Sequence, residues 1–165
     1  MGNFSFDVTT GADLQEVDNA VNQTMKEARQ RYDFKGSKCT IDFDRTKAEL
    51  KLEADDEYRL KAFFDILQGK FIQRKVPVKN LDVGQHEEAS GGRMRMLITL
   101  TQSIPADTAR EIVKAVKAKK MKKVQVAIQG DQLRVSSPSK DSLQEVMGFL
   151  GEEDWGIELN FGNYR

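Results

Sequence analysis

The chain has 165 residues, enough for one ordinary domain or two small ones, and its formal net charge is zero. Hydrophobic residues make up 39% and charged residues 32%, which is typical of a globular protein and excludes a disordered one. No apolar run approaches the ~20 residues of a membrane span, and the N-terminus lacks a signal-peptide pattern. The single cysteine, Cys39, excludes an intramolecular disulfide, so we expect a cytoplasmic protein that does not bind a membrane.

The N-terminal part of the chain predicts a strand followed by a long helix. Apolar and polar side chains alternate over residues 4–8, as in a half-buried strand. Asp13–Glu16 reads as a capping box, which opens an amphipathic helix that we expect to end at Gly36. The apolar stripe of this helix is Leu14, Val17, Val21, Met25, Ala28 and Tyr32.

A hairpin, a second helix and a short strand are predicted next. Residues 41–43 and 50–52 alternate as strands and are joined across Arg45–Lys47. Asp55 and Asp56 open a helix whose apolar positions run to Phe71, and residues 81–83 form a short strand. The order to this point is strand, helix, strand, strand, helix, strand.

The same order recurs in the second half of the chain. Apolar residues at positions 94–100 predict a strand, and Pro105 suits the first turn of a helix. A hairpin turns at Gly130-Asp131, Ser139 caps another helix, and residues 157–161 form the last strand. The sequence therefore predicts two copies of one βαββαβ unit.

We place the two repeats at residues 1–90 and 91–165, with the polar stretch Gln85–Gly92 at their boundary. Right-handed crossovers put both helices of a unit on one face of its sheet. The predicted fold class is α+β: duplicated ferredoxin-like units, each with a four-stranded antiparallel sheet. The other face of each sheet either faces the second sheet or binds a partner.

The residues that could support catalysis, a metal or a cofactor are few. Cys39 alternates with apolar residues on a strand, which favours a buried structural thiol. His86 is the only histidine and lies in the polar stretch, where we expect a solvated side chain. Acidic residues at Asp55–Glu57 are explained by the helix dipole. The turn Thr10–Asp13 lacks the arginine that an acylphosphatase needs, and we predict that the protein is not an enzyme.

A basic cluster is the strongest positive signal, since seven of the 14 residues from Arg110 to Lys123 are basic. Such a cluster can bind a nucleotide phosphate or a phosphodiester backbone, although a solvated helix face explains it equally well. We predict that phosphates are held by Arg110, Lys114, Lys117, Lys119, Lys120, Lys122 and Lys123. Gln125 and Arg134 on the adjoining strands are predicted to orient the ligand.

A second, smaller set of candidates is Arg31, Tyr32 and Lys35. The tyrosine ring could stack on a base, but its place on the apolar stripe of the first helix favours packing in the core. Recognition of RNA by exposed strand aromatics is disfavoured, because the central strands at residues 49–53 and 132–135 carry none. Contact with RNA through the lysines stays open.

Five stretches of the sequence carry a family resemblance. They are Asp13–Val21 (DLQEVDNAV), Arg31–Ser37 (RYDFKGS), Val124–Asp131 (VQVAIQGD) with Arg134-Val135, Leu143–Val146 (LQEV) and Asn160–Arg165 (NFGNYR). Together they closely resemble the YajQ family of bacterial proteins over nearly the whole chain. The resemblance implies a duplicated ferredoxin-like fold whose units exchange their N-terminal strands, at residues 4–10 and 93–101. It also implies nucleotide binding, and some members are described as cyclic-di-GMP receptors that act through a transcription factor.

The chain departs from the family at Ser137–Lys140, where a basic loop is usual before the last helix. Our leading hypothesis is a nucleotide-binding protein without catalytic activity, with cyclic-di-GMP, GTP and ATP as candidate ligands and a cyclic-di-GMP effector as its most specific form. One alternative is an accessory protein that contacts RNA or tRNA through the same lysines. Another is an adaptor whose basic face docks on an acidic protein.

Overall fold

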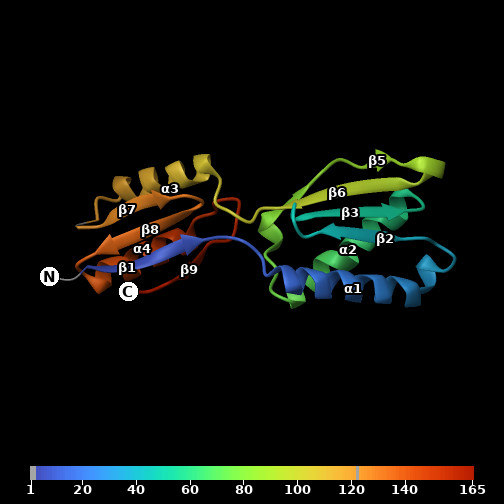
Figure 1. Ribbon diagram of the computed structural model, residues 1–165, viewed down its shortest axis with the longest axis horizontal. Coiled ribbons are helices and arrows are strands. Elements are labelled where there is room, and N and C mark those ends of the chain that lie inside the picture. The colour runs from blue at the N-terminus through green and yellow to red at the C-terminus, as the bar shows by residue number, and fades with distance from the viewer. Residues whose placement is uncertain (1–2, 122) are drawn as a thin grey trace. The chain divides into compact units, whose positions relative to one another are not determined.

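The computed structural model describes residues 3–121 and 123–165 (Figure 1). The strands are β1 (Phe4–Thr9), β2 (Thr40–Asp44), β3 (Glu49–Ala54), β4 (Leu81–Val83), β5 (Glu87–Glu88), β6 (Met94–Leu100), β7 (Gln125–Gln129), β8 (Gln132–Ser137) and β9 (Asn160–Gly162). The α-helices are α1 (Leu14–Gln30), α2 (Glu57–Gln73), α3 (Ala106–Ala118) and α4 (Lys140–Glu152). Short 3₁₀ turns occur at Tyr32–Phe34, Val78–Asn80 and Ser90–Gly92.

The chain forms two compact units, and neither unit coincides with one of the two sequence repeats. The central unit is Ala12–Thr101; the terminal unit combines the chain up to Gly11 with Gln102–Arg165. The sheet of the terminal unit has the order β7-β8-β1-β9, and that of the central unit has the order β2-β3-β6-β4, with β5 also paired to β6. Each sheet thus takes its third strand, β1 or β6, from the start of the other repeat, which confirms the predicted α+β class with exchanged strands.

The placement of the repeats at residues 1–90 and 91–165 concerns the sequence pattern and stays a prediction. The spatial units end elsewhere, at Gly11 and Thr101, because the exchanged strands leave their own repeats.

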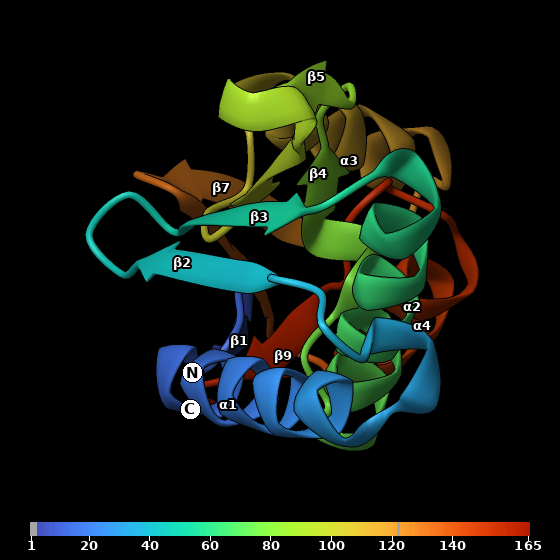
Figure 2. The ribbon, with the colours of Figure 1, turned by 90° about the vertical axis from the view of Figure 1, so that its right-hand side faces the viewer.

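In the central unit, both helices pack on one face of the antiparallel sheet (Figure 2). Alternate residues of the paired strands β3 and β6 face them, and Leu52 lies opposite Met96 in the register. The core between the layers consists of fully buried side chains that include Leu50, Leu60, Phe63, Leu67, Phe71 and Ile98. Burial of one such side chain contributes about 1.5–3 kcal/mol, so this layer holds the unit together.

The terminal unit repeats this arrangement with its own core. In the register, Phe6 of β1 lies opposite Val135 of β8, and Val8 lies opposite Leu133. These four side chains are fully buried, and the residues of α3 and α4 that pack on the same face are Ala109, Ile112, Val116, Leu143, Val146 and Leu150. The face turned away from the helices is therefore lined by the intervening polar residues of each strand.

The predicted helix starts are confirmed by capping hydrogen bonds. The side chain of Asp13 accepts from the backbone N–H of Gln15 at 2.9 Å at the start of α1. Asp56 caps α2 and Ser139 caps α4 in the same way. Pro105 occupies the cap position of α3, one residue before the first helical turn. The side chains of Asp13, Asp56 and Ser139 thus satisfy first-turn amides that have no partner within the helix, whereas Pro105 makes no side-chain capping bond.

The first helix ends earlier than the sequence predicts. It stops at Gln30, because Arg31 takes an extended conformation, and the chain continues as a 3₁₀ turn. The helical spacing therefore no longer applies at Tyr32, whose side chain is 90% exposed, while Phe34 is buried instead. The prediction that Tyr32 packs in the core is wrong.

The last strand is also shorter than predicted, because β9 begins only at Asn160, although Ile157 is buried. Among the residues that the structure describes, no helix is both long and apolar enough to cross a bilayer.

Candidate functional site

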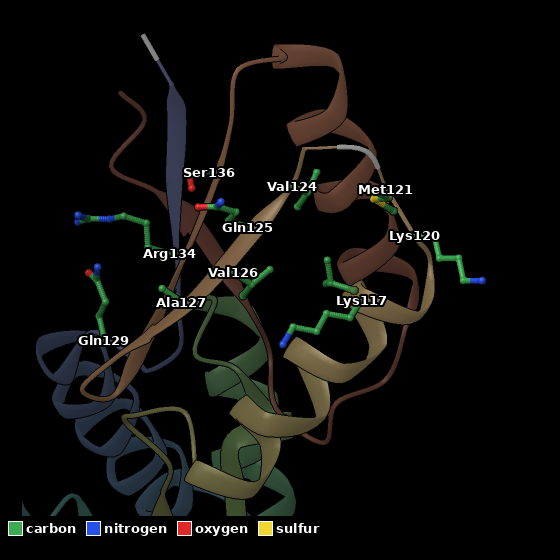
Figure 3. Close-up of a pocket in the computed structure, with 11 residues that line it drawn as sticks. Lys117, Lys120, Met121, Val124, Gln125, Val126, Ala127, Gln129, Arg134 and Ser136 are labelled. Carbon is green, nitrogen blue, oxygen red and sulfur yellow. The ribbon is translucent and has the colours of Figure 1, made fainter. Parts of the chain in front are cut away.

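A groove of about 600 Å³ lies in the terminal unit, beside the C-terminal end of α3 and the strand β7 (Figure 3). We call it the α3–β7 groove. Its walls combine apolar, cationic and neutral polar side chains. They are Val116, Lys117, Lys120, Met121, Val124, Gln125, Val126, Ala127, Gln129, Arg134 and Ser136. Cavities of this size hold small organic ligands.

The position of β7 at the end of its sheet creates this groove. The strand has a neighbour, β8, on one side only, and a turn at Gly130-Asp131 joins the two. Gly130 has a φ of +65°, a conformation that a residue without a side chain adopts at no steric cost. Alternation along β7 then directs Val126 toward the helix side and Gln125 and Gln129 toward the opposite face.

Four of the predicted ligand-binding residues line the groove: Lys117, Lys120, Gln125 and Arg134. Lys117 extends toward β7, whereas Lys120 extends away from the strands (Figure 3). Arg134 and Gln129 lie on the other side of β7 from these lysines. The groove therefore offers cationic groups on both faces of its edge strand.

The other members of the predicted basic cluster do not line the groove. Arg110 and Lys114 are exposed on earlier turns of α3. The ammonium of Lys119 lies 4.9 Å from the centre of the Phe149 ring, a cation–π contact. Lys123 is exposed, with a φ of +59°. Lys122 lies outside the described residues.

Sequence reasoning missed an ionic cluster centred on Asp7 of β1. Asp7 is 6% exposed, and its Oδ1 accepts from the Arg134 Nε at 2.9 Å. Its Oδ2 accepts from the side-chain amide of Asn163 at 2.7 Å. The bonds from Arg134 and Asn163 lower the pKa of the Asp7 carboxyl, against the opposing effect of burial. The bond to Asp7 in turn raises the pKa of Arg134.

A bulge at the C-terminus aims Asn163 at this carboxylate. Asp7 pairs with Gly162, and two backbone hydrogen bonds of 3.1 and 3.0 Å join Ser5 to Arg165. Two residues, Asn163 and Tyr164, therefore oppose Phe6 alone, which is the geometry of a β-bulge. Asn163 takes a φ of +52°, a conformation that asparagine tolerates better than most residues. The strand register, which composition does not reveal, was the signal needed to find this cluster.

The smaller predicted set, Arg31, Tyr32 and Lys35, is only partly available for a ligand. Arg31 donates to both carboxylate oxygens of Asp33, at 2.9 and 2.7 Å, and this contact raises its pKa. The guanidinium also lies 5.3 Å from the centre of the Phe34 ring. Tyr32 is exposed, and Lys35 lines a separate cavity of about 220 Å³. These residues stay a secondary candidate site.

The structure gives His86 and Cys39 structural roles. The His86 side chain lies in a loop, is 24% exposed and bonds the carboxylate of Glu57, so it is only partly solvated. Cys39 is half-buried, and burial raises the pKa of its thiol, which keeps the unreactive protonated form. In the described part of the chain, no three side chains of the kinds that ligate metals are grouped together.

The fold and the groove together define a class of protein: a two-unit ferredoxin-like α+β protein with a cationic groove at a sheet edge. A family model described as "Nucleotide-binding protein YajQ-like" matches residues 4–165. The chain therefore belongs to the YajQ family.

Similar proteins match the chain from end to end. A "Nucleotide-binding protein" of Geotalea uraniireducens is 52% identical over 161 residues, which cover 98% of both chains. A protein of Citrifermentans bemidjiense with the same name is 49% identical over the same share of both chains. "Nucleotide-binding protein Acid345_2028" of Koribacter versatilis is 46% identical over 100% of this chain and 99% of its own.

Proposed function

We propose that the protein binds a nucleotide in the α3–β7 groove and does so without catalysing a reaction. The observation that carries this proposal is the pair of lysines, Lys117 and Lys120, on a groove of about 600 Å³ in a member of a family described as nucleotide-binding. In the described part of the chain, neither lysine forms an ion pair. Their charge is therefore available to phosphate groups.

The lining residues suggest which wall of the groove contacts which part of a nucleotide. Lys117 and Lys120 bind phosphate oxygens, and Arg134 adds a second cationic wall. Asp7 engages only the Nε and Nη2 atoms of Arg134, and a guanidinium has five N–H donors, so this group can still donate to a phosphate. The amide side chains of Gln125 and Gln129 suit the edge of a base, since an amide both donates and accepts.

The chemistry of the walls supports the proposal that the protein is not an enzyme. None of the described residues that line the groove carries a carboxylate, an imidazole or a thiol. Lysine, glutamine and serine side chains alone supply no general base near neutral pH unless a lysine loses its proton. Incubation with GTP or ATP should therefore release no phosphate above the uncatalysed background.

Among the candidate ligands we favour a cyclic dinucleotide such as cyclic-di-GMP. The two lysines extend in different directions (Figure 3), which suits two separate phosphates better than one compact triphosphate. A triphosphate is usually cradled by a glycine-rich loop, and no glycine is among the described lining residues. An effector of this kind would act through a protein partner such as a transcription factor, and the free thiol of Cys39 suits a cytoplasmic location.

Calorimetric titration with cyclic-di-GMP, GTP and ATP tests the proposal. We expect heat of binding with the cyclic dinucleotide at about 100 μM ligand, and at least about a tenfold loss of affinity in the double variant Lys117→Glu/Lys120→Glu. The control is Lys61→Glu, an exposed helical lysine of the central unit. No heat with any of the three ligands would overturn the proposal.

The variant Lys114→Glu separates the groove from the rest of the basic cluster. Lys114 is exposed on α3 but does not line the groove. If Lys114→Glu loses less nucleotide affinity than Lys117→Glu does, the ligand lies in the groove. An equal loss would instead mean that the whole face of α3 binds the phosphates.

RNA binding is a second candidate, because exposed Lys119 and Lys123 extend the positive charge beyond the groove. A polyanion could follow these residues, whereas a small nucleotide could not. The affinity for a single-stranded RNA should fall steeply as salt is added. For each phosphate that the protein neutralises, the logarithm of the binding constant should fall by about 0.7 when the salt concentration rises tenfold. A flat salt response of oligonucleotide binding would exclude this candidate.

A further inference from the structure

We propose that β7 is a docking strand for an extended, acidic segment of a partner protein, which adds to the free edge of the terminal unit's sheet. This inference concerns protein recognition and does not require that a nucleotide binds. It rests on three properties of β7: its end position, its lack of charge and the lysines beside it.

The end position leaves backbone groups of β7 without neighbours. The two-residue turn at Gly130-Asp131 closes on the pair Gln129 and Gln132, so Gln129, Ala127 and Gln125 direct their backbone groups to β8. The groups of Val126 and Ile128 then point outward. Within the described residues, no backbone hydrogen bond from outside the sheet reaches these two residues. An added strand can satisfy them.

Two of the other edge strands, β2 and β9, are protected, whereas β7 is not. Charged side chains, bulges and short strands normally block pairing with other chains. The edge strand β2 carries Asp42 and Asp44, and β9 has three residues followed by the bulge at Asn163. By contrast, β7 reads Gln-Val-Ala-Ile-Gln and leaves the Ile128 side chain 49% exposed. An unprotected edge of this kind indicates that β7 pairs with a strand of another protein.

The charge beside this edge selects an acidic partner. Lys117 and Lys120 line the groove on the helix side of β7, and Lys123 precedes the strand. Side chains of an added strand point alternately to the two faces of the sheet. Every second residue of the docked segment therefore faces the helix side, where Lys117 extends toward β7, and the residues between them face the side of Gln125 and Gln129. The expected segment has acidic residues at alternate positions.

A second copy of this chain is a weaker occupant of the same edge. The sequence of β7 could pair with itself in antiparallel fashion about Ala127. Such pairing would bring the α3 helices of both copies to the same face of a joined sheet, and their exposed lysines would repel each other. An acidic segment removes this repulsion.

Fluorescence anisotropy with labelled seven-residue peptides tests the proposal on the full chain. In the probe, glutamate alternates with threonine; in the matched peptide, lysine replaces each glutamate. We expect the glutamate peptide to bind at least about tenfold more tightly. Methylation of the peptide backbone nitrogens that face β7 should abolish binding, and methylation of the intervening nitrogens should not. Equal binding by both methylated peptides would overturn the pairing of strands.

Two further measurements guard against a general effect of charge. Peptide binding should slow amide exchange at Val126 and Ile128, while Ala127, already bonded to β8, should change little. The double variant Lys117→Glu/Lys120→Glu should no longer bind the glutamate peptide, whereas Lys61→Glu should bind it with unchanged affinity. If the peptide fails and an oligonucleotide or a second copy occupies the edge instead, the proposal is wrong. Nucleotide titration of the same samples reports separately on the proposed function.

Discussion

The two units differ at one equivalent position on the sheet faces that are turned away from the helices. In the register of the terminal unit, Asp7 lies opposite Arg134; at the corresponding point of the central unit, Leu97 lies opposite Lys51. Asp7 is 6% exposed within its ionic cluster, whereas Leu97 is 45% exposed. One scaffold therefore carries a fixed carboxylate in one copy and an apolar side chain in the other.

The hairpin edges of the two units differ in the same way. In the central unit, Asp44 accepts from the backbone N–H groups of Thr46 and Lys47, and Arg45 bonds Asp18 of α1 at 2.9 Å. These contacts fix the turn beside β2 and add charge to its edge. The corresponding edge of the terminal unit, β7, is uncharged and faces the groove. The two repeats form similar frameworks, and side chains at a few equivalent positions make their hairpin edges differ in charge.

The largest effect should come from the exchanged strands, because their core residues stabilise the unit that receives them. Phe6 is fully buried and packs edge to face with Phe161 at 5.7 Å. We expect Phe6→Ala to destabilise the terminal unit by about 3–5 kcal/mol. Urea unfolding followed by the fluorescence of Trp155, the single tryptophan, measures this.

The matched substitution in the central unit is Met96→Ala, at the equivalent position of β6. This substitution should lower the free energy of unfolding of the central unit by about 2–5 kcal/mol. Amide hydrogen exchange in α2 measures the change. An unchanged Trp155 transition in Phe6→Ala would contradict the placement of β1 in the terminal sheet.

A smaller effect should follow when the terminal unit is given the side chain of the central unit. In Asp7→Leu, Arg134 and Asn163 lose their shared acceptor, and we expect a loss of about 1–2 kcal/mol by the Trp155 transition. The comparison is Leu97→Ala in the central unit, which should change stability by less than about 0.5 kcal/mol. Equal effects of the two substitutions would mean that the ionic cluster does not stabilise the terminal unit.

The contribution of Asp7 should depend on pH in a defined direction. Its pKa is lowered in the folded state, chiefly by the bond from Arg134, from an unfolded value of about 3.9. The stabilisation is therefore complete above about pH 5 and is lost as the pH falls through the lowered folded value. The stability gap between the protein and Asp7→Asn should narrow between pH 7 and pH 3. A gap that widens on acidification would contradict this pairing.

Much of the fold could be predicted, because it depends on local patterns. The four helices, the two hairpins and the caps at Asp13, Asp56 and Ser139 follow from periodicity and capping chemistry. The end of α1 could not be predicted in this way. Arg31 bonds Asp33 and stacks on Phe34, and these contacts favour a 3₁₀ turn over continued helix. A helical stripe cannot reveal contacts that form only after the helix has ended.

The candidate site could be predicted only in part. Charge along the sequence identified Lys117 and Lys120 but could not separate them from Arg110 and Lys114, since that choice depends on where α3 ends beside β7. The partner of Arg134 is Asp7, more than 120 residues away, in a strand exchanged from the other repeat. Only the sheet register brings them together.

The smallest effect should come from the loop Ser137–Lys140, which precedes α4. The Ser139 Oγ accepts from the Ser142 N–H at 3.2 Å, and the Ser137 Oγ accepts from the Ser139 N–H at 3.1 Å. We expect Ser139→Ala to cost about 1 kcal/mol of unfolding free energy by the Trp155 transition. Ser139→Asp should restore it, because Asp56 caps α2 of the central unit with the same chemistry. Equal losses in both variants would contradict a capping role, and unchanged nucleotide affinity in both would show that ligand binding does not depend on this cap.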